Sequence, residues 1–230
     1  MGFFDNVQVD HNVAVDEDRL GGYQPIASGI YKGKIEMAHG VKAQSGAQGL
    51  RVVFNLTVDG KPRALEQTFW ITTREGKTFT IGSDGTRRNL GGYNQAQALA
   101  SLLCNNDLFK LETQDRPVKV RNDTPDMVPV FVGMLNKEVA IAVLEVEENA
   151  RKKQPNGNYE PVNERRKTNE IDKIFDAQGF TSTERKANAG NPEFATKWKE
   201  RWAGKTKDNF KEVAGSTSSS NNVGATIAFD

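Results

Sequence analysis

The spacing of apolar residues predicts a run of β-strands in the first half of the chain. Within residues 50–58 every second residue is apolar, which is the period of a strand with one buried face. Residues 29–40 and 64–74 are also typical of strands, and Asp59-Gly60 is a hairpin turn signal. We therefore expect a meander of three strands, followed by a short ribbon at 77–81 that leads into a glycine-rich loop.

A helical period follows this loop. The apolar residues of 94–104 fall on one face of a helix, and Asn94 is a suitable N-cap residue. Alternation then returns in three further segments separated by turn residues. These segments predict a short strand at 117–121, a long strand at 136–147 and a returning edge strand at 159–167.

The last third of the chain is predicted to be helical. We expect one helix at 170–178 that ends at Gly179, and a second at 191–204. The second has Asn191 as its expected N-cap and Gly204 just past its end. Its three aromatic residues fall at i, i+4 and i+8, so packing onto the strands is the default interpretation of this stripe.

This order of elements predicts a mainly β fold with appended helices. A meander of three strands, a helix and two closing strands is the order of a five-stranded OB-fold-like barrel, with the helix between strands 3 and 4. A generic β-barrel or an α+β sandwich has the same order. The expected domains are an acidic N-terminal arm (1–24), the barrel (25–180), a C-terminal helical extension (181–212) and a flexible tail (213–230) that carries a terminal docking motif.

Charge is unevenly distributed along a chain with a net charge of +1. Residues 1–30 hold five acids and one base, a net of −4, whereas residues 151–215 hold fifteen bases and ten acids, a net of +5. This distribution suits a basic face for a polyanion and an acidic segment that competes for it. No apolar run reaches the length that spans a bilayer, and the N-terminus lacks the features of a secretory signal, so we expect a cytoplasmic protein without membrane contacts.

The residues that catalysis needs are scarce. The chain has one cysteine, Cys104, and two histidines, His11 and His39, too few for an ordinary zinc site. Two Gly-Lys-Thr triplets resemble phosphate-binding loops, but both lack the upstream glycine of that motif. We therefore expect a binding protein without a catalytic site, metal or cofactor, rather than an enzyme.

The third predicted strand has features of a single-stranded nucleic-acid site, which needs aromatic platforms for bases and cations for phosphates. Trp70 alternates with the core residues of this strand and is followed by Arg74. Coverage of Trp70 by the loop or the tail helices is the equal alternative. Further candidates are the residues of the following loop, pairs of bases on the first and fourth strands, and two basic triplets with a tyrosine on the 136–167 hairpin, although each triplet alone is also typical of solvated surface. They are Lys77, Phe79, Arg87, Arg88 and Tyr93; Lys32 and Lys34; Lys119 and Arg121; Arg151, Lys152, Lys153, Tyr159, Arg165, Arg166 and Lys167.

The opening MGFFDN, the barrel-like strands, NEIDKIF (169–175) and FATKWKERW (194–202) resemble the single-stranded DNA-binding proteins of tailed bacteriophages. The resemblance covers most of residues 1–212. It implies an OB-fold protein that coats single-stranded DNA during phage replication, recombination and repair, in the cytosol of an infected bacterium. Two alternatives remain: a strand-annealing recombination factor, and a virion structural protein with a β-barrel body.

The resemblance also implies a C-terminal tail that recruits replication or recombination proteins. Here the tail is rich in Ser, Asn and Thr and ends in Ile227-Ala-Phe-Asp230, with no acid before Asp230. We expect Ile227, Phe229 and Asp230 to form the docking motif, with the apolar pair in a pocket and the carboxylates against a basic rim. A terminus without function is the alternative. The sequence leaves self-association open.

Overall fold

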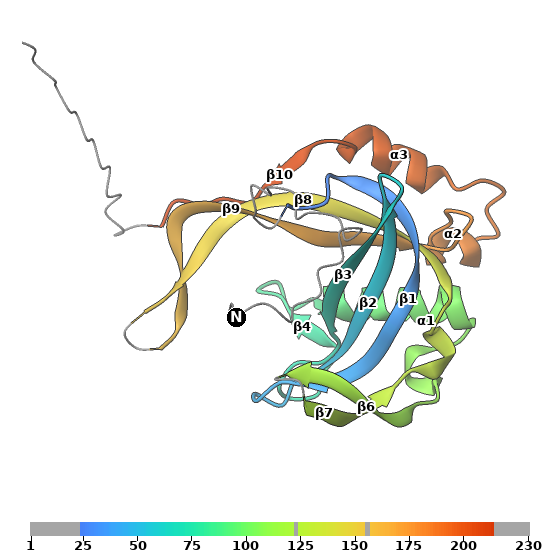
Figure 1. The fold of residues 1–230 in the computed structure, drawn as a ribbon, viewed down its shortest axis with the longest axis horizontal. Coiled ribbons are helices and arrows are strands. Elements are labelled where there is room, and N and C mark those ends of the chain that lie inside the picture. The colour runs from blue at the N-terminus through green and yellow to red at the C-terminus, as the bar shows by residue number, and fades with distance from the viewer. Residues whose placement is uncertain (1–23, 122–123, 155–156, 214–230) are drawn as a thin grey trace, which may run out of the picture.

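The computed structural model describes residues 24–121, 124–154 and 157–213, and it confirms a mainly β fold with few helices (Figure 1). One helix lies in the middle of the chain and two lie near its C-terminus. The strands are β1 (Gly29–Lys42), β2 (Gln48–Val58), β3 (Lys61–Trp70), β4 (Phe79–Ile81), β5 (Arg87–Asn89), β6 (Gln114–Arg121), β7 (Thr124–Val130), β8 (Glu138–Lys153), β9 (Tyr159–Phe175) and β10 (Thr206–Asp208); the helices are α1 (Gly91–Cys104), α2 (Ser182–Lys186) and α3 (Glu193–Trp202).

β1 organises the main sheet because it pairs along both edges. One edge pairs with β2, which pairs in turn with β3, so the predicted meander is present. The other edge pairs first with β8 and then, at His39, with β7. The register shifts between Ile35 and Met37, as at a β-bulge, and such a kink lets one strand change partners. At Gly33 the strands cross so closely that a Cβ would lie 2.2 Å from the Asn55 carbonyl oxygen, so only glycine fits there.

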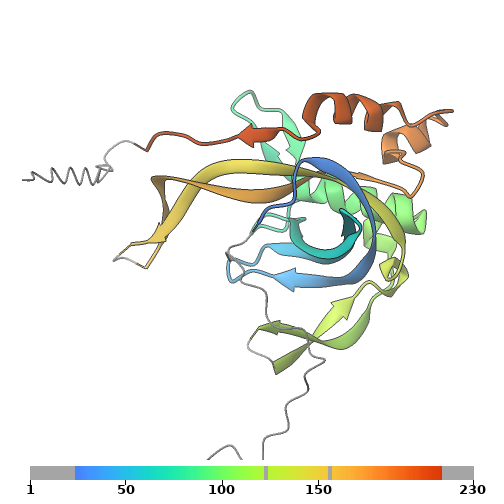
Figure 2. The ribbon, with the colours of Figure 1, turned by 45° about the horizontal axis from the view of Figure 1, so that its top comes forward.

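β8 is buried on both faces in its first half. Val139, Ile141 and Val143 belong to the main core, together with β1, β2 and α1. The residues between them face a second cluster that includes Phe175 and Trp198 of α3. A strand covered on both faces reads as a continuous apolar run, as residues 139–144 do. The helical extension therefore packs over β8 on the side of the sheet that points away from the main core (Figure 2), as the aromatic stripe predicted.

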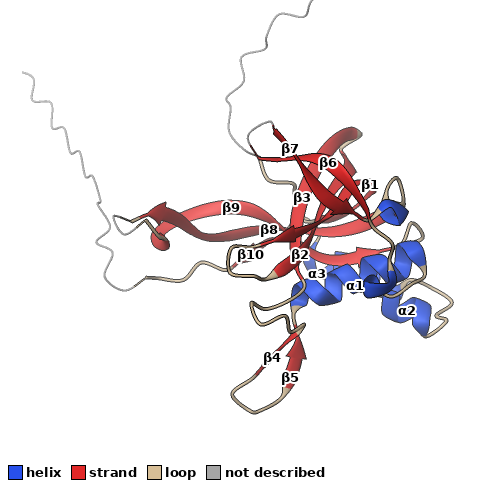
Figure 3. Cartoon of the chain, turned by 90° about the horizontal axis from the view of Figure 1, so that it is seen from below, coloured by secondary structure: helices blue, strands red, loops and turns tan. Residues whose placement is uncertain are grey.

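The sheet is not closed into a barrel, which corrects the prediction of a closed five-stranded barrel. The hydrogen-bonded path runs β10-β8-β1-β2-β3, and β9 lies along the opposite edge of β8. Within the described residues, β3 pairs only with β2 and so forms an open edge. β8 and β9 continue beyond the sheet as a long ribbon (residues 145–153 and 159–169) that projects from the body (Figures 1 and 3).

The predicted helix at 170–178 is wrong, because β9 continues to Phe175. Ile171, Ile174 and Phe175 are buried against β8, and pairing with this long apolar strand outweighs the local helical pattern. Gly179 instead closes a turn, with a φ of 93° and a hydrogen bond from its N–H to the Asp176 carbonyl.

The boundaries of the two long helices differ slightly from the expected ones. α1 begins at Gly91 after an N-cap at Leu90, so Asn94 lies within the helix. α3 begins at Glu193 after Pro192, and Gly204 follows its end with a φ of 69°, the left-handed conformation expected there. Within the described residues no helix is long and apolar enough to cross a membrane.

Candidate nucleic-acid interface

The surface of β1–β3 that points away from the main core is called the outer face here; it is formed by Lys32, Lys34, Arg51, Asn55, Thr68 and Trp70. Cross-strand pairing places Trp70 beside Gly49, Thr68 beside Arg51, and Lys34 beside Asn55. Because β2 rises about 3.4 Å per residue, the Trp70 and Lys34 rows lie about 20 Å apart. The outer face therefore has an aromatic end and a basic end.

Trp70 is 44% exposed, so neither the described loop nor the helices cover it. Its ring lies over Gly49, where a Cβ would come within 3.0 Å of the Trp70 Cε3 atom. Its backbone is held from the other side by Gly92, where a Cβ would lie 2.3 Å from the Trp70 carbonyl oxygen. Two glycines thus allow a tight fit that fixes the base of the tryptophan while part of the ring stays in solvent. Thr72, two residues after Trp70, is buried because β3 ends at Trp70.

Arg51 occupies the middle of the outer face. Its Nε atom donates a hydrogen bond to Thr68 Oγ1 (3.2 Å) and lies 3.4 Å from Glu66 Oε1. His39 on the neighbouring strand is buried, and burial lowers its pKa, an effect that the Gly40 carbonyl opposes and Arg51 increases. The guanidinium is therefore held across two strands, and its closest acidic partner, Glu66, is exposed.

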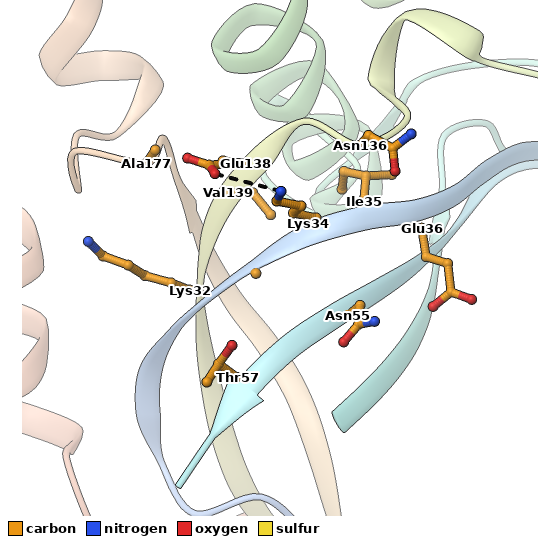
Figure 4. Close-up of a pocket in the computed structure, with 11 residues that line it drawn as sticks. Lys32, Lys34, Ile35, Glu36, Asn55, Thr57, Asn136, Glu138, Val139 and Ala177 are labelled. Carbon is orange, nitrogen blue, oxygen red and sulfur yellow. Dashed lines mark ion pairs between the residues drawn. The ribbon is translucent and has the colours of Figure 1, made fainter. Parts of the chain in front are cut away.

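Lys32 and Lys34 line a pocket of about 460 Å³ at the basic end (Figure 4). Asn55 and Thr57 of β2 line it from one side and Asn136 and Glu138 from the other, with Ala177 at the rim. Lys34 Nζ lies 3.9 Å from Glu138 Oε1, and both side chains are exposed. Lys32 forms no ion pair within the described residues.

The glycine-rich loop after β3 forms a separate two-stranded finger (residues 79–89), which projects from the body (Figure 3). Arg87 lies over the ring of Phe79, with its Cζ 5.1 Å from the ring centroid. Arg88 Nη2 is 2.9 Å from Asp84 Oδ2, and hydrogen bonds from Thr86 lead the effects that lower the pKa of Asp84. The finger is thus a short hairpin that exposes aromatic and basic groups and is stabilised by contacts among its own residues.

Lys77 and Arg74 lie in the connection between β3 and the finger, and both are exposed. Arg74 pairs with its neighbour Glu75, and this hydrogen bond lowers the pKa of Glu75 to about 2. Lys77 forms no ion pair within the described residues.

A second aromatic platform lies beyond Trp70. Tyr93 and Phe109 stack with ring centroids 5.9 Å apart and an interplanar angle of 16°, and Phe109 is 63% exposed. Phe109 also lines an apolar pocket of about 390 Å³, together with Gly49, which carries the Trp70 ring on its other side. The stacked pair therefore adjoins this pocket, whose lining includes Gly49 but not the Trp70 ring. Tyr93 was a predicted site residue, whereas Phe109 was missed; an aromatic residue beside Lys110 after a helix was the available signal.

The basic side chains of the ribbon mostly pair with acids. Arg166 lies 2.6 Å from Glu148, and Lys167 lies 2.7 Å from Glu145, a contact that lowers the pKa of Glu145. Arg165 and Lys152 form ion pairs too. Arg165 is 2.9 Å from Glu147 and 3.2 Å from Asp208. Lys152 is 2.5 Å from Glu164. Within the described residues Arg151 and Lys153 form no ion pair, and Tyr159, beside Lys153, is 61% exposed.

The ribbon also binds the segment that follows α3, called the strap here (residues 206–213). Asn149 donates to the Lys211 carbonyl and accepts from the Lys211 N–H, and Asn163 does the same with Val213. Phe210 of the strap lies under Arg165, 4.3 Å from its Cζ. The ribbon thus binds the strap in addition to presenting basic side chains.

The remaining predicted residues lie elsewhere. Lys119 is exposed on β6, which pairs with β7 away from the outer face, and the side chain of Arg121 is outside the described part of the chain. The docking residues Ile227, Phe229 and Asp230 also lie outside it. The structure therefore brings the residues of 70–93 together near one end of the outer face and separates them from the ribbon.

Two properties bear on the chemistry of this surface. Within the described residues, no three His, Cys, Asp or Glu side chains are grouped so that they could hold a metal ion. Cys104 is half-buried, and this burial raises its pKa, which disfavours the reactive thiolate. The sequence itself matches no protein-family model and no curated protein.

Proposed function

We propose that this protein binds single-stranded DNA without sequence specificity, through the outer face, the finger and the stacked Tyr93–Phe109 pair. The observation that carries the proposal is the position of Trp70, an exposed ring braced by two glycines at one end of a polar, partly basic sheet. A ring held in this way loses little conformational freedom when a base stacks on it.

Single strands fit this surface better than duplexes do. The faces of the bases are available for stacking only when a strand is unpaired, and each stacked base contributes about 1–3 kcal/mol. Trp70 and the Tyr93–Phe109 pair offer two platforms, and the apolar pocket lies beside the second. Lys32, Lys77 and Arg87 supply cations outside ion pairs for the phosphates.

We further propose that the described strands are an open variant of the OB-fold, and that the chain acts as a phage single-stranded DNA-binding protein in replication, recombination and repair. The support is the resemblance stated above, together with the β1–β2–β3 meander, the helix that follows it, and the two partners of β1. Recruitment of replication or recombination proteins through Ile227, Phe229 and Asp230 completes this proposal.

Tryptophan fluorescence tests the DNA-binding proposal directly. The chain has three tryptophans, and Trp198 and Trp202 lie in α3, where they pack in the second cluster. A Trp198→Phe/Trp202→Phe variant therefore leaves Trp70 as the only reporter. We expect oligo-dT to quench its fluorescence, with affinity that falls steeply with salt and exceeds that for duplex of equal length. Absence of quenching and of binding at low salt would overturn the proposal.

The same preparation separates the alternative functions. A strand-annealing factor would accelerate the pairing of complementary oligonucleotides, whereas a coating protein would hold them apart. A virion structural protein would bind neither form of DNA at low salt. We expect oligo-dT binding and slowed annealing.

A further inference from the structure

The open edge of β3 lies where the sheet would otherwise continue. β2 occupies one side of β3 from Lys61 to Trp70, and within the described residues no strand occupies the other. Leu65 packs against the main core from this strand, and Phe69 is buried in it. An edge of ten residues next to a hydrophobic core is a template for a further strand.

The chain enters the described structure beside this edge. Ile26 is buried in the main core, and Asn169 of β9 both donates to its carbonyl oxygen (2.7 Å) and accepts from its N–H (2.8 Å). Arg63 of β3 donates from Nη2 to the carbonyl oxygen of Gln24 (2.9 Å). Residues 24–26 therefore connect the far strand of the sheet with its open edge, and the preceding chain starts next to β3.

The residues before this point contain a strand pattern. Valine occupies positions 7, 9, 13 and 15, with His11 between them, and no large apolar residue occupies the positions in between. This two-residue period is typical of a strand with one buried face, and valine favours strands. The segment belongs to the predicted acidic arm, and its alternation suits an edge without a partner among the described strands.

The length and charge of residues 16–23 also suit a connection from residues 7–15 to Gln24 beside β3. Residues 16–23 include Gly21-Gly22 and can span about 26 Å, enough for a return turn from Gln24. This connector is acidic, with Asp16, Glu17 and Asp18, whereas the start of β3 carries Lys61 and Arg63.

We propose that residues 7–15 of the same chain bind the open edge of β3 as an antiparallel strand, with their valines toward Leu65 and Phe69. Antiparallel pairing lets the segment end near Arg63, at the start of β3, where Gln24 lies. The interaction is β-strand addition, in which backbone hydrogen bonds supply affinity and alternate side chains supply register. It does not depend on the proposed DNA binding.

Hydrogen–deuterium exchange of the full chain tests this proposal. Val9→Asp/Val13→Asp places two carboxylates on the side facing the core, and Gln8→Asp/Asn12→Asp places two on the opposite side as the matched control. In the wild type and the control, we expect amides of residues 7–15 and of the outer edge of β3 to exchange at least tenfold more slowly than those of residues 214–226. In the Val9→Asp/Val13→Asp variant this protection is lost in both segments. Unprotected residues 7–15 in the wild type, or equal effects of the two variants, would overturn the proposal.

The same measurement identifies the source of the strand. Protection that is independent of protein concentration supports pairing within one chain, whereas protection that appears only with a dimer in light scattering means that a second copy supplies the strand and overturns the intramolecular proposal. Oligo-dT binding is measured in parallel. Normal DNA binding without protection rejects only the strand addition, and protection without DNA binding rejects only the proposed function.

Discussion

The outer face and the ribbon both carry basic side chains, yet these side chains have different partners. On the ribbon, four of the six predicted bases pair with acids on the facing strand or on the strap. On the outer face and finger, Lys32 and Arg87 have no acidic partner in the described part of the chain, and an exposed tryptophan lies at one end of the sheet. The number of bases is therefore a poor guide to which surface meets a polyanion.

The difference follows from strand register. Glu145, Glu147 and Glu148 lie on β8 opposite the triplet Arg165-Arg166-Lys167 on β9, so the hairpin neutralises itself. Exposed pairs of this kind contribute little to stability, typically less than about 1 kcal/mol, and a phosphate can compete for their cations. The ribbon can therefore assist binding, but the outer face has the groups already available.

The largest effect is expected at Trp70. Trp70→Ala removes the exposed platform and should weaken oligo-dT binding by about 5- to 150-fold, the equivalent of about 1–3 kcal/mol. Trp70→Phe keeps a smaller ring and should lose less, and Trp202→Phe on α3 should change nothing. Fluorescence anisotropy of labelled oligo-dT measures all three. Unchanged affinity of Trp70→Ala would remove the outer face from the interface.

Phe109 should have the next largest effect. Phe109→Ala exposes the Tyr93 ring beneath it, so part of the platform remains and the loss should be near the lower limit for one stacked base, about fivefold. Phe194 is a matched control, since it is also exposed but lies on α3. If Phe194→Ala weakened binding more than Phe109→Ala, the exposed surface of α3 would be the DNA-binding surface.

The sequence predicted the meander, the helix after it and the packing of α3, because these depend on local periodicity. It missed β7, which contains Pro125 and Pro129 and has no clean alternation. It also predicted a helix at 170–178, where pairing with β8 instead makes most of this segment part of β9.

The candidate site shows the same limit. Alternation alone placed Trp70 opposite the core side of β3, but the exposure of its ring depends on Gly49 and Gly92, which come from other elements. Ion pairing on the ribbon depends on the β8–β9 register, which no local pattern supplies.

Two double variants test the contrast within the ribbon itself. Arg151→Gln/Lys153→Gln removes bases without acidic partners and should lower the dependence of log affinity on log salt by up to about 1.4, two phosphates at about 0.7 each. Arg165→Gln/Arg166→Gln removes paired bases and should lower it by less. Salt titrations from 50 to 200 mM compare them. An equal or larger effect of the paired bases would show that DNA displaces the acids and that the ribbon is a primary contact.

The smallest expected effect is on the pH dependence of stability, which differs between His39 in the sheet and the strap contacts of the ribbon. Burial lowers the pKa of His39 below its unfolded value near 6.5, so the unfolded chain binds more protons and stability falls as pH drops below about 6.5. The strap contacts behave differently: hydrogen bonds lower the pKa of Asp208 and Glu145, so their contribution persists at pH 5 and is lost only when pH falls through those lowered values. Thermal unfolding between pH 7.5 and 5 should therefore show a modest loss of stability that His39→Gln removes and Asp208→Asn does not. If Asp208→Asn removed it instead, the pH-sensitive contact in this range would lie on the ribbon and not at His39.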